Sequence, residues 1–211
     1  PFGLTAGAPA LDFGKAVAWK DGIVQRLNNG VAALLRKAKV KIVHGRARFR
    51  DGKTVVVETE TGPKVIRAEK IVIATGSVPV ELPFLPFGGP VISSTEALAL
   101  AEVPKTLAVV GGGYIGLELG IAFAKLGSQV TVVEAQGSIL PLYDSDLTAP
   151  VAKKLTSLGV EVLLGAKARG LAPKGDALLI ETADGQERRI AADKILVTVG
   201  RQPATSGLGL E

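Results

Sequence analysis

The residues with the clearest chemical meaning are a glycine-rich run and an acid that follows it along the chain. The run is Gly111-Gly112-Gly113-Tyr114-Ile115-Gly116, and the acid is Glu134. In the spacing G-x-G-x-x-G, the first glycine allows a tight turn, the second lets the backbone approach a pyrophosphate, and the third permits close packing of a helix on a strand. The first turn of that helix offers unpaired N–H groups and a partial positive charge to phosphates. The run therefore predicts a dinucleotide site.

The segments around this run have the order that a dinucleotide-binding unit requires. Residues 106–110 are a short apolar run, typical of a buried parallel strand. A helix is expected from about Ile115 to Lys125, followed by a second apolar strand over residues 129–134. Strand, glycine loop, helix, strand and terminal acid in this order predict a Rossmann-like α/β unit, and the alternative is a glycine-rich turn without a ligand.

Glu134 bears on which dinucleotide is bound. An acid at the end of the second strand hydrogen-bonds the adenosine ribose hydroxyls and repels a 2′-phosphate. A site for NADP would place Arg or Lys just after the acid, and residues 135–138 are Ala-Gln-Gly-Ser. NAD is therefore favoured over NADP. FAD is held by the same kind of acid, so this motif alone leaves NAD and FAD open.

An internal duplication organises the rest of the chain. Residues 40–45 resemble residues 160–165, and residues 68–79 share Ala, Lys, Ile, Gly and Pro with residues 192–203 at matched positions. Between these segments each copy carries a β-hairpin signal, over residues 54–63 in the first copy and 177–185 in the second. We expect strands at 40–44 and 68–76 in the first copy, as at the matching positions of the second.

Each copy is also expected to follow an amphipathic helix. In the first copy the apolar positions on one face include Ile23, Leu27, Val31 and Leu34. In the second copy Asp144 or Ser145 begins the helix, Gly159 ends it, and the apolar positions are Leu147, Val151, Leu155 and Leu158. A glycine-loop unit precedes only the second copy, so we expect a matching unit before Pro1.

Composition excludes several classes of protein. The chain has 211 residues, of which 47% are hydrophobic and 21% charged, enough for one or two domains with a real core and too apolar for a disordered chain. No apolar run approaches the roughly 20 residues of a membrane helix. The absence of Cys and the single His argue against disulfide, thiolate or metal chemistry in these residues. A net charge of +5 points only weakly to polyanions, because the basic residues are interleaved with acidic ones and few aromatic residues could stack on bases, so no nucleic-acid partner is expected.

The segments at 109–120, 73–77, 197–201, 88–97 and 139–146 strongly resemble the flavoprotein disulfide reductases that contain two dinucleotide-binding folds. Within that family they are most similar to dihydrolipoyl dehydrogenases. The resemblance implies a duplicated fold in which each unit has a parallel sheet with helices and a β-meander. It implies that residues 1–77 are the C-terminal part of an FAD domain, 78–92 a linker, 93–204 a complete NAD domain, and 205–211 the start of the return into the FAD domain.

The resemblance also implies roles for individual residues. Residues that would contact FAD are Gly45 and Ala47 near the adenine, and Thr75, Gly76 and Ser77 near the ribose and pyrophosphate. Residues that would contact NAD beyond the glycine loop are Ala168 and Gly200. Tyr114 would be a ring that covers the flavin and swings aside for nicotinamide, and Glu118 an acid that pairs with a lysine near the flavin.

Parts that the family needs for turnover are missing from the 211 residues. The first glycine loop, the redox-active Cys pair and the lysine would precede Pro1, and a C-terminal domain with a His-Glu dyad would follow Glu211. The resemblance implies a cytoplasmic homodimer that passes electrons from a dihydrolipoyl group of an acyltransferase in a 2-oxo acid dehydrogenase complex through FAD to NAD⁺. We expect the fragment alone to be inactive. The alternatives are a segment of a sibling flavoprotein, such as an NADH oxidase or another disulfide or mercuric reductase, and a non-catalytic NAD-binding module.

Overall fold

The computed structural model describes residues 10–210, which belong to two compact units. The loop unit, which carries the glycine-rich run, comprises Pro79–Gly200 and residues 10–21. The companion unit comprises Gly22–Val78 and residues 201–210. Each unit has its own sheets.

The loop unit is built on a five-stranded parallel sheet, as the apolar runs in the sequence predict. Its strands are β5 (Val91–Ile92), β12 (Lys194–Val197), β6 (Thr106–Val110), β7 (Gln129–Glu134) and β8 (Glu161–Leu164), in that spatial order. Every neighbouring pair runs parallel. The helices are α2 (Ser94–Ala97), α3 (Tyr114–Lys125) and α4 (Ser145–Ser157). The expected helix after the glycine loop is confirmed and begins at Tyr114.

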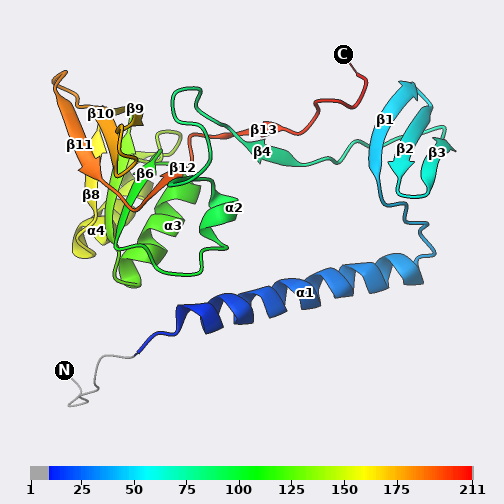
Figure 1. The fold of residues 1–211 in the computed structure, drawn as a ribbon, viewed down its shortest axis with the longest axis horizontal. Coiled ribbons are helices and arrows are strands. Elements are labelled where there is room, and N and C mark those ends of the chain that lie inside the picture. The colour runs from blue at the N-terminus through cyan, green and yellow to red at the C-terminus, as the bar shows by residue number, and fades with distance from the viewer. Residues whose placement is uncertain (1–9, 211) are drawn as a thin grey trace. The chain divides into compact units, whose positions relative to one another are not determined.

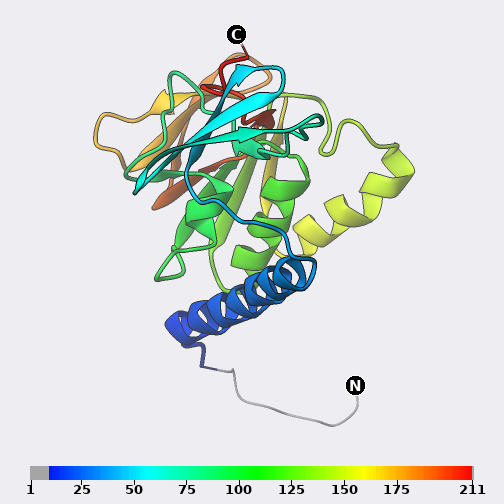
Figure 2. The same ribbon diagram turned by 90° about the vertical axis from the view of Figure 1, so that its right-hand side faces the viewer.

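Alternating side chains along the central strand divide the loop unit into two cores. Leu107 and Val109 of β6 pack with the helices, whereas Ala108 and Val110 pack with a three-stranded antiparallel meander on the opposite face. The meander consists of β9 (Lys167–Leu171), β10 (Ala177–Glu181) and β11 (Glu187–Ala191) (Figure 1). Figure 2 shows α4, in yellow-green, on the opposite side of the unit from the orange strands. The parallel sheet is therefore covered on both faces.

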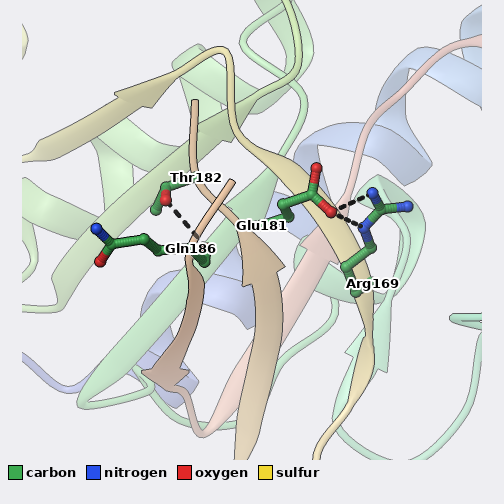
Figure 3. A network of polar contacts seen from close by, with 4 residues as sticks. All are labelled: Arg169, Glu181, Thr182 and Gln186. Carbon is green, nitrogen blue, oxygen red and sulfur yellow. Dashed lines mark hydrogen bonds and ion pairs between the residues drawn. The ribbon is translucent and has the colours of Figure 1, made fainter. Parts of the chain in front are cut away.

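The companion unit contains a second antiparallel meander, as the duplication predicts. Its strands are β1 (Arg46–Asp51), β2 (Thr54–Thr59) and β3 (Gly62–Arg67), in the order β1-β2-β3. An ion pair joins Arg48 on β1 to Glu58 on β2 at 3.6 Å, and in the other meander Arg169 on β9 pairs with Glu181 on β10 (Figure 3). The two short strands β4 (Ser77–Pro79) and β13 (Arg201–Pro203) pair with each other.

Two expected strands of the first copy do not form. Residues 40–44 and 68–76 are irregular, and Val72 is 88% exposed. In the second copy the matching segments are strands because β8 pairs with β7, and β12 lies between β5 and β6. Within residues 10–210, no other strand runs beside residues 40–44 or 68–76 to pair with them. A strand without a hydrogen-bonded neighbour does not persist, whatever its propensity.

The helices differ from expectation in length and burial. The first helix is α1 (Phe13–Lys37), which begins earlier than its apolar pattern indicates and has no buried residue. Leu27 and Leu34 are exposed, because no described element packs on the apolar face of α1 there. In α4, Leu155 is fully buried, but Leu147 is exposed at the first turn, so the predicted apolar face packs only partly. Across residues 10–210, no helix combines the length and apolar character needed to cross a bilayer.

Candidate nucleotide-binding site

The glycine-rich run lies where a parallel sheet offers a crevice. β6 leads into Gly111 and the neighbouring β12 leads into Thr198, so both strands end at the same edge of the sheet. From β6 the chain continues to β7 and β8 on one side, and it returns to β12 on the other. In open α/β sheets, ligands bind outside the carboxyl ends of the strands at such a reversal of strand order.

The three motif positions are occupied by glycine for different physical reasons. Gly111 has a φ of +107°, and a Cβ there would lie 2.6 Å from the carbonyl oxygen of Thr198. A Cβ on Gly116 would lie 2.5 Å from the carbonyl oxygen of Gly111. A Cβ on Gly113 would meet no atom within 4 Å. Packing thus requires glycine at the first and third positions, whereas the second faces open space that a ligand can enter.

Gly113 is also the residue that starts the helix. It is the N-cap of α3 and has no side chain to bond the first N–H groups, and the first turn of α3 carries no acid. The first N–H groups of a helix have no partner within the helix, so they remain available to an anion. Open space at Gly113 and these donors together fit a pyrophosphate.

Glu134 points towards the loop and is 7% exposed. Its Oε2 accepts a hydrogen bond from the Gly112 N–H at 2.6 Å, and its Oε1 accepts one from the Gln136 N–H at 2.7 Å. Each carboxylate oxygen can accept more than one hydrogen bond, so the group retains acceptors for ribose hydroxyls. The structure therefore shows a role that the sequence does not reveal: Glu134 holds the glycine loop.

Two further residues hold this loop, and sequence reasoning missed both. The Thr198 hydroxyl lies 3.2 Å from the carbonyl oxygen of Val110 and 3.3 Å from that of Gly111, as a hydrogen-bond donor. The Leu140 N–H donates to the Gly112 carbonyl oxygen at 2.9 Å, and Leu140 has a φ of +49°, which is uncommon for a residue with a side chain. Leu140 lies in the segment 139–146 that carries the family resemblance, but its residue type does not indicate a contact with the loop. Thr198 lies in the repeated segment before Gly200, which is the one available signal.

Tyr114 and Glu118 lie on one exposed face of α3. Tyr114 is the first residue of the helix and is 60% exposed, so it is not part of the core. Glu118 follows one helical turn later and is also exposed. Ile115, between them in sequence, is half-buried. The two predicted flavin-side residues are therefore neighbours at the start of the helix that follows the loop.

Ala168 and Gly200 lie after strands that end at the same edge of the sheet. The backbone N–H of Ala166 donates to the Glu134 carbonyl oxygen at 3.0 Å, which places the start of β9, and thus Ala168, next to the end of β7. Ala168 is half-buried against the core under the meander. Gly200 follows Thr198 by two residues and is exposed, with a φ of +148°.

The predicted FAD residues belong to the companion unit. A Cβ on Gly45 would lie 2.2 Å from the Glu58 carbonyl oxygen, and Ala47 lies opposite Val57 in the β1–β2 ladder. Thr75 and Gly76 are in the exposed segment before β4. The hydroxyl of Ser77 in β4 accepts a hydrogen bond from Arg201 Nε at 2.8 Å. The 211 residues contain one G-x-G-x-x-G motif, in the loop unit, so the companion unit has only part of what a dinucleotide site needs.

Comparison with known proteins gives consistent matches over nearly the whole chain. A family model described as pyridine nucleotide-disulphide oxidoreductase matches residues 5–211. The chain is 54% identical over 210 residues to a dihydrolipoyl dehydrogenase of Pseudomonas aeruginosa and 43% identical over 210 residues to one of Geobacillus stearothermophilus. Each match covers 99% of this chain and 45% of the relative. The chain thus spans less than half the length of these curated relatives.

Solved structures give the same result. The structure of LpdA from Mycobacterium tuberculosis superposes with a TM-score of 0.85 at 26% identity, covering 97% of this chain and 46% of that one. The HOCl-induced flavoprotein disulfide reductase RclA from Escherichia coli superposes with a TM-score of 0.82 at 32% identity, covering 94% of this chain and 45% of that one.

Proposed function

Since the chain belongs to the pyridine nucleotide-disulphide oxidoreductase family, we propose that it is the NAD-binding portion of a flavoprotein disulfide reductase, of the dihydrolipoyl dehydrogenase type. The observation that carries the proposal is the geometry at the edge of the parallel sheet. A buried carboxylate, Glu134, is directed at a glycine loop whose second position, Gly113, borders open space at a helix start. This arrangement matches a dinucleotide with free ribose hydroxyls.

The proposed roles of the loop unit follow from this geometry. The amides at Gly113 and the start of α3 bind the pyrophosphate, and Glu134 binds the adenosine ribose and disfavours a 2′-phosphate. Ala168 and Gly200 border the same crevice. Bound NAD⁺ supplies a hydride acceptor, and the contribution of this chain is to position it. Tyr114 is proposed to cover the flavin side of the crevice, and Glu118 to be the acid on that side.

The proposed domain assignment keeps residues 93–204 as the NAD domain and 78–92 as a linker, whose last two residues form the edge strand β5 of the parallel sheet. Residues 1–77 and 205–211 are proposed to be parts of an FAD domain. The equivalent meanders β1–β3 and β9–β11 support a duplicated origin of the two units. Gly45, Ala47, Thr75, Gly76 and Ser77 are the proposed FAD contacts. The companion unit has no glycine loop of its own in the 211 residues, so no flavin chemistry is assigned to it.

The proposed reaction of the parent protein is electron transfer from a dihydrolipoyl group of an acyltransferase, in a 2-oxo acid dehydrogenase complex, to NAD⁺. The proposed parent is a homodimer in the cytoplasm. The chain contains no Cys, so no thiol–disulfide exchange takes place within these residues. We therefore expect the 211-residue chain to bind NADH without turning over dihydrolipoamide. A second candidate, a segment of a sibling flavoprotein disulfide reductase, is favoured by the similarity to RclA.

Titration of the 211-residue chain with NADH and NADPH tests the proposal, with calorimetry or nicotinamide fluorescence as the readout. Glu134→Gln removes the charge but keeps a carbonyl oxygen for a backbone amide, which Glu134→Arg would not. Loss of a charge-assisted contact should raise the Kd for NADH by roughly tenfold or more and reduce the preference over NADPH. Glu187→Gln, at an exposed position of β11, is the matched control and should change neither value.

Three outcomes would contradict the proposal. One is the absence of NADH binding by the unmodified chain. Another is an unchanged preference for NADH over NADPH in Glu134→Gln. A third is a yellow preparation with bound flavin, because it would mean either that the glycine loop holds FAD or that the companion unit binds FAD without a glycine loop of its own. Measurable dihydrolipoamide–NAD activity of the 211-residue chain would refute its proposed inactivity.

A further inference from the structure

Thr198 lies where β12 and β6, the two central strands at the site, end. It follows β12 directly, and its backbone N–H donates to the Val110 carbonyl oxygen at 2.8 Å, extending the β12–β6 pairing by one residue. Its side chain is half-buried against the glycine loop. The sequence pattern assigns no role to this residue, and the binding of NAD as proposed above does not use it.

The crowding that requires two of the motif glycines comes partly from Thr198. A Cβ on Gly111 would lie 2.6 Å from the Thr198 carbonyl oxygen, and a Cβ on Gly116 would lie 2.5 Å from its Oγ1. The backbone and side chain of Thr198 therefore fill the space that these two glycines leave. Thr198 and the glycine loop are far apart in the sequence, and they pack so closely that a side chain at Gly111 or Gly116 would not fit.

The hydroxyl of Thr198 and the carboxylate of Glu134 act on the same peptide group. The Gly111 carbonyl oxygen accepts from Thr198 Oγ1 at 3.3 Å, and the Gly112 N–H of that same peptide donates to Glu134 Oε2 at 2.6 Å. A peptide group is planar, so contacts on both of its sides fix its rotation. The bond to Thr198 is long, and the hydroxyl proton is shared with the Val110 carbonyl oxygen at 3.2 Å.

The next peptide group is held as well, which determines where the free donors point. The Gly112 carbonyl oxygen accepts from the Leu140 N–H at 2.9 Å. The Gly113 N–H belongs to that same planar group and is directed the opposite way. Side-chain and backbone contacts thus orient the two successive peptide groups that lead to Gly113, which borders open space.

We propose that Thr198 is a positioning residue for nucleotide binding: its hydroxyl fixes the Gly111–Gly112 peptide so that the amides at Gly113 and the start of α3 are aimed at the diphosphate. This inference rests on the proposed nucleotide site. It gives Thr198 a role distinct from that of Glu134, because the diphosphate is common to NADH, NADPH and ADP, whereas the ribose contact is not. Loss of the hydroxyl should weaken all three ligands by the same factor.

The test compares Thr198→Val with Thr198→Ser in the 211-residue chain. Valine keeps the shape but removes the hydroxyl, and serine keeps the hydroxyl. Losing one long hydrogen bond should raise the Kd for NADH by about fivefold in Thr198→Val, with ADP and NADPH weakened equally, and Thr198→Ser should restore affinity to within about twofold. The Gly112 amide, measured by hydrogen exchange without ligand, should exchange faster in Thr198→Val only.

Each outcome decides one of the two proposals. Unchanged affinity in Thr198→Val, or equal weakening in Thr198→Ser, would overturn the role of the hydroxyl. A changed NADH-to-NADPH ratio in Thr198→Val would also overturn it. If the unmodified chain binds no NADH or ADP, the proposed function fails, and faster exchange at Gly112 would still show that Thr198 holds the peptide.

Discussion

The two copies of the internal repeat have similar sequences and reach different structures. Their meanders agree: β1-β2-β3 and β9-β10-β11 have the same order, and the ion pairs Arg48–Glu58 and Arg169–Glu181 occupy equivalent places in them. Their flanking segments differ. Residues 194–197, Lys-Ile-Leu-Val, form β12, whereas the matching residues 70–73, Lys-Ile-Val-Ile, are irregular. Local propensity alone therefore does not make these segments strands, because a parallel strand needs neighbours on the sheet.

The largest effect should come from matched truncations in residues 68–79 and 192–203, the segments that end the two copies of the repeat. Leu196 in β12 is fully buried, whereas the matching Val72 is 88% exposed. Leu196→Ala should lower the free energy of unfolding by about 2–5 kcal/mol, because it leaves a cavity between β12 and the helices. Val72→Ala should change it by less than about 0.5 kcal/mol. Urea unfolding followed by circular dichroism measures both, and equal losses would mean that residues 70–73 are packed in solution.

A smaller effect is expected at the start of the two meanders. Gly45 has a φ of +155°, and a Cβ there would lie 2.2 Å from the Glu58 carbonyl oxygen, whereas a Cβ on the matching Gly165 would approach only the Ala183 methyl group at 3.0 Å. Gly45→Ala should therefore destabilise the β1–β2 hairpin by about 1–3 kcal/mol, and Gly165→Ala should cost less.

Amide hydrogen exchange in β1 and β2 is the appropriate measurement for Gly45→Ala, because it reports on that hairpin alone. Gly52→Ala, in the turn of the same hairpin where a Cβ meets no atom within 4 Å, is the control. If protection in Gly45→Ala matches that of Gly52→Ala, the close approach of the two strands at Gly45 is not maintained in solution.

The smallest effect concerns the acid near the start of each of these two segments, Asp193 in the second copy and Glu69 in the first. The Thr106 N–H donates to Asp193 Oδ2 at 2.9 Å, and this backbone hydrogen bond lowers the pKa of Asp193. Because the pKa of Asp193 is lower in the folded chain, its carboxylate stabilises the fold at pH values above the unfolded pKa of aspartate. This stabilisation is lost as the pH falls through the folded pKa. Asp193→Asn should lower the free energy of unfolding at neutral pH by under about 1 kcal/mol.

That difference between Asp193→Asn and the unmodified chain should shrink as the pH falls below about 3.9, the ordinary aspartate value. Urea unfolding at neutral pH and near pH 3 measures it. Glu69 is the matching residue of the first copy and is exposed, so Glu69→Gln is the control and should change the free energy of unfolding by less than about 0.5 kcal/mol. A difference for Asp193→Asn that is constant with pH would show that the loss comes from the side chain's shape rather than its charge.

The sequence predicts the parts of this molecule that are determined by neighbouring residues. The order β6, glycine loop, α3 and β7 follows from local apolar runs and from the steric needs of Gly111 and Gly116. The contacts of Thr198 and Leu140 with the loop were missed, because each joins segments distant in sequence. The amphipathic helix expected in the first copy forms as α1 but buries no residue, because an apolar stripe indicates which face can pack and not whether a partner is present.

The ends of the segment Pro79–Gly200 lie together. The backbone N–H of Val80 donates to the Gly200 carbonyl oxygen at 3.0 Å, so the chain enters and leaves this part of the loop unit at one place. A segment with adjoining ends can be inserted into, or removed from, a host protein without stretching the host backbone. The adjoining ends therefore make residues 79–200, the proposed nucleotide-binding module, suited to grafting into another scaffold.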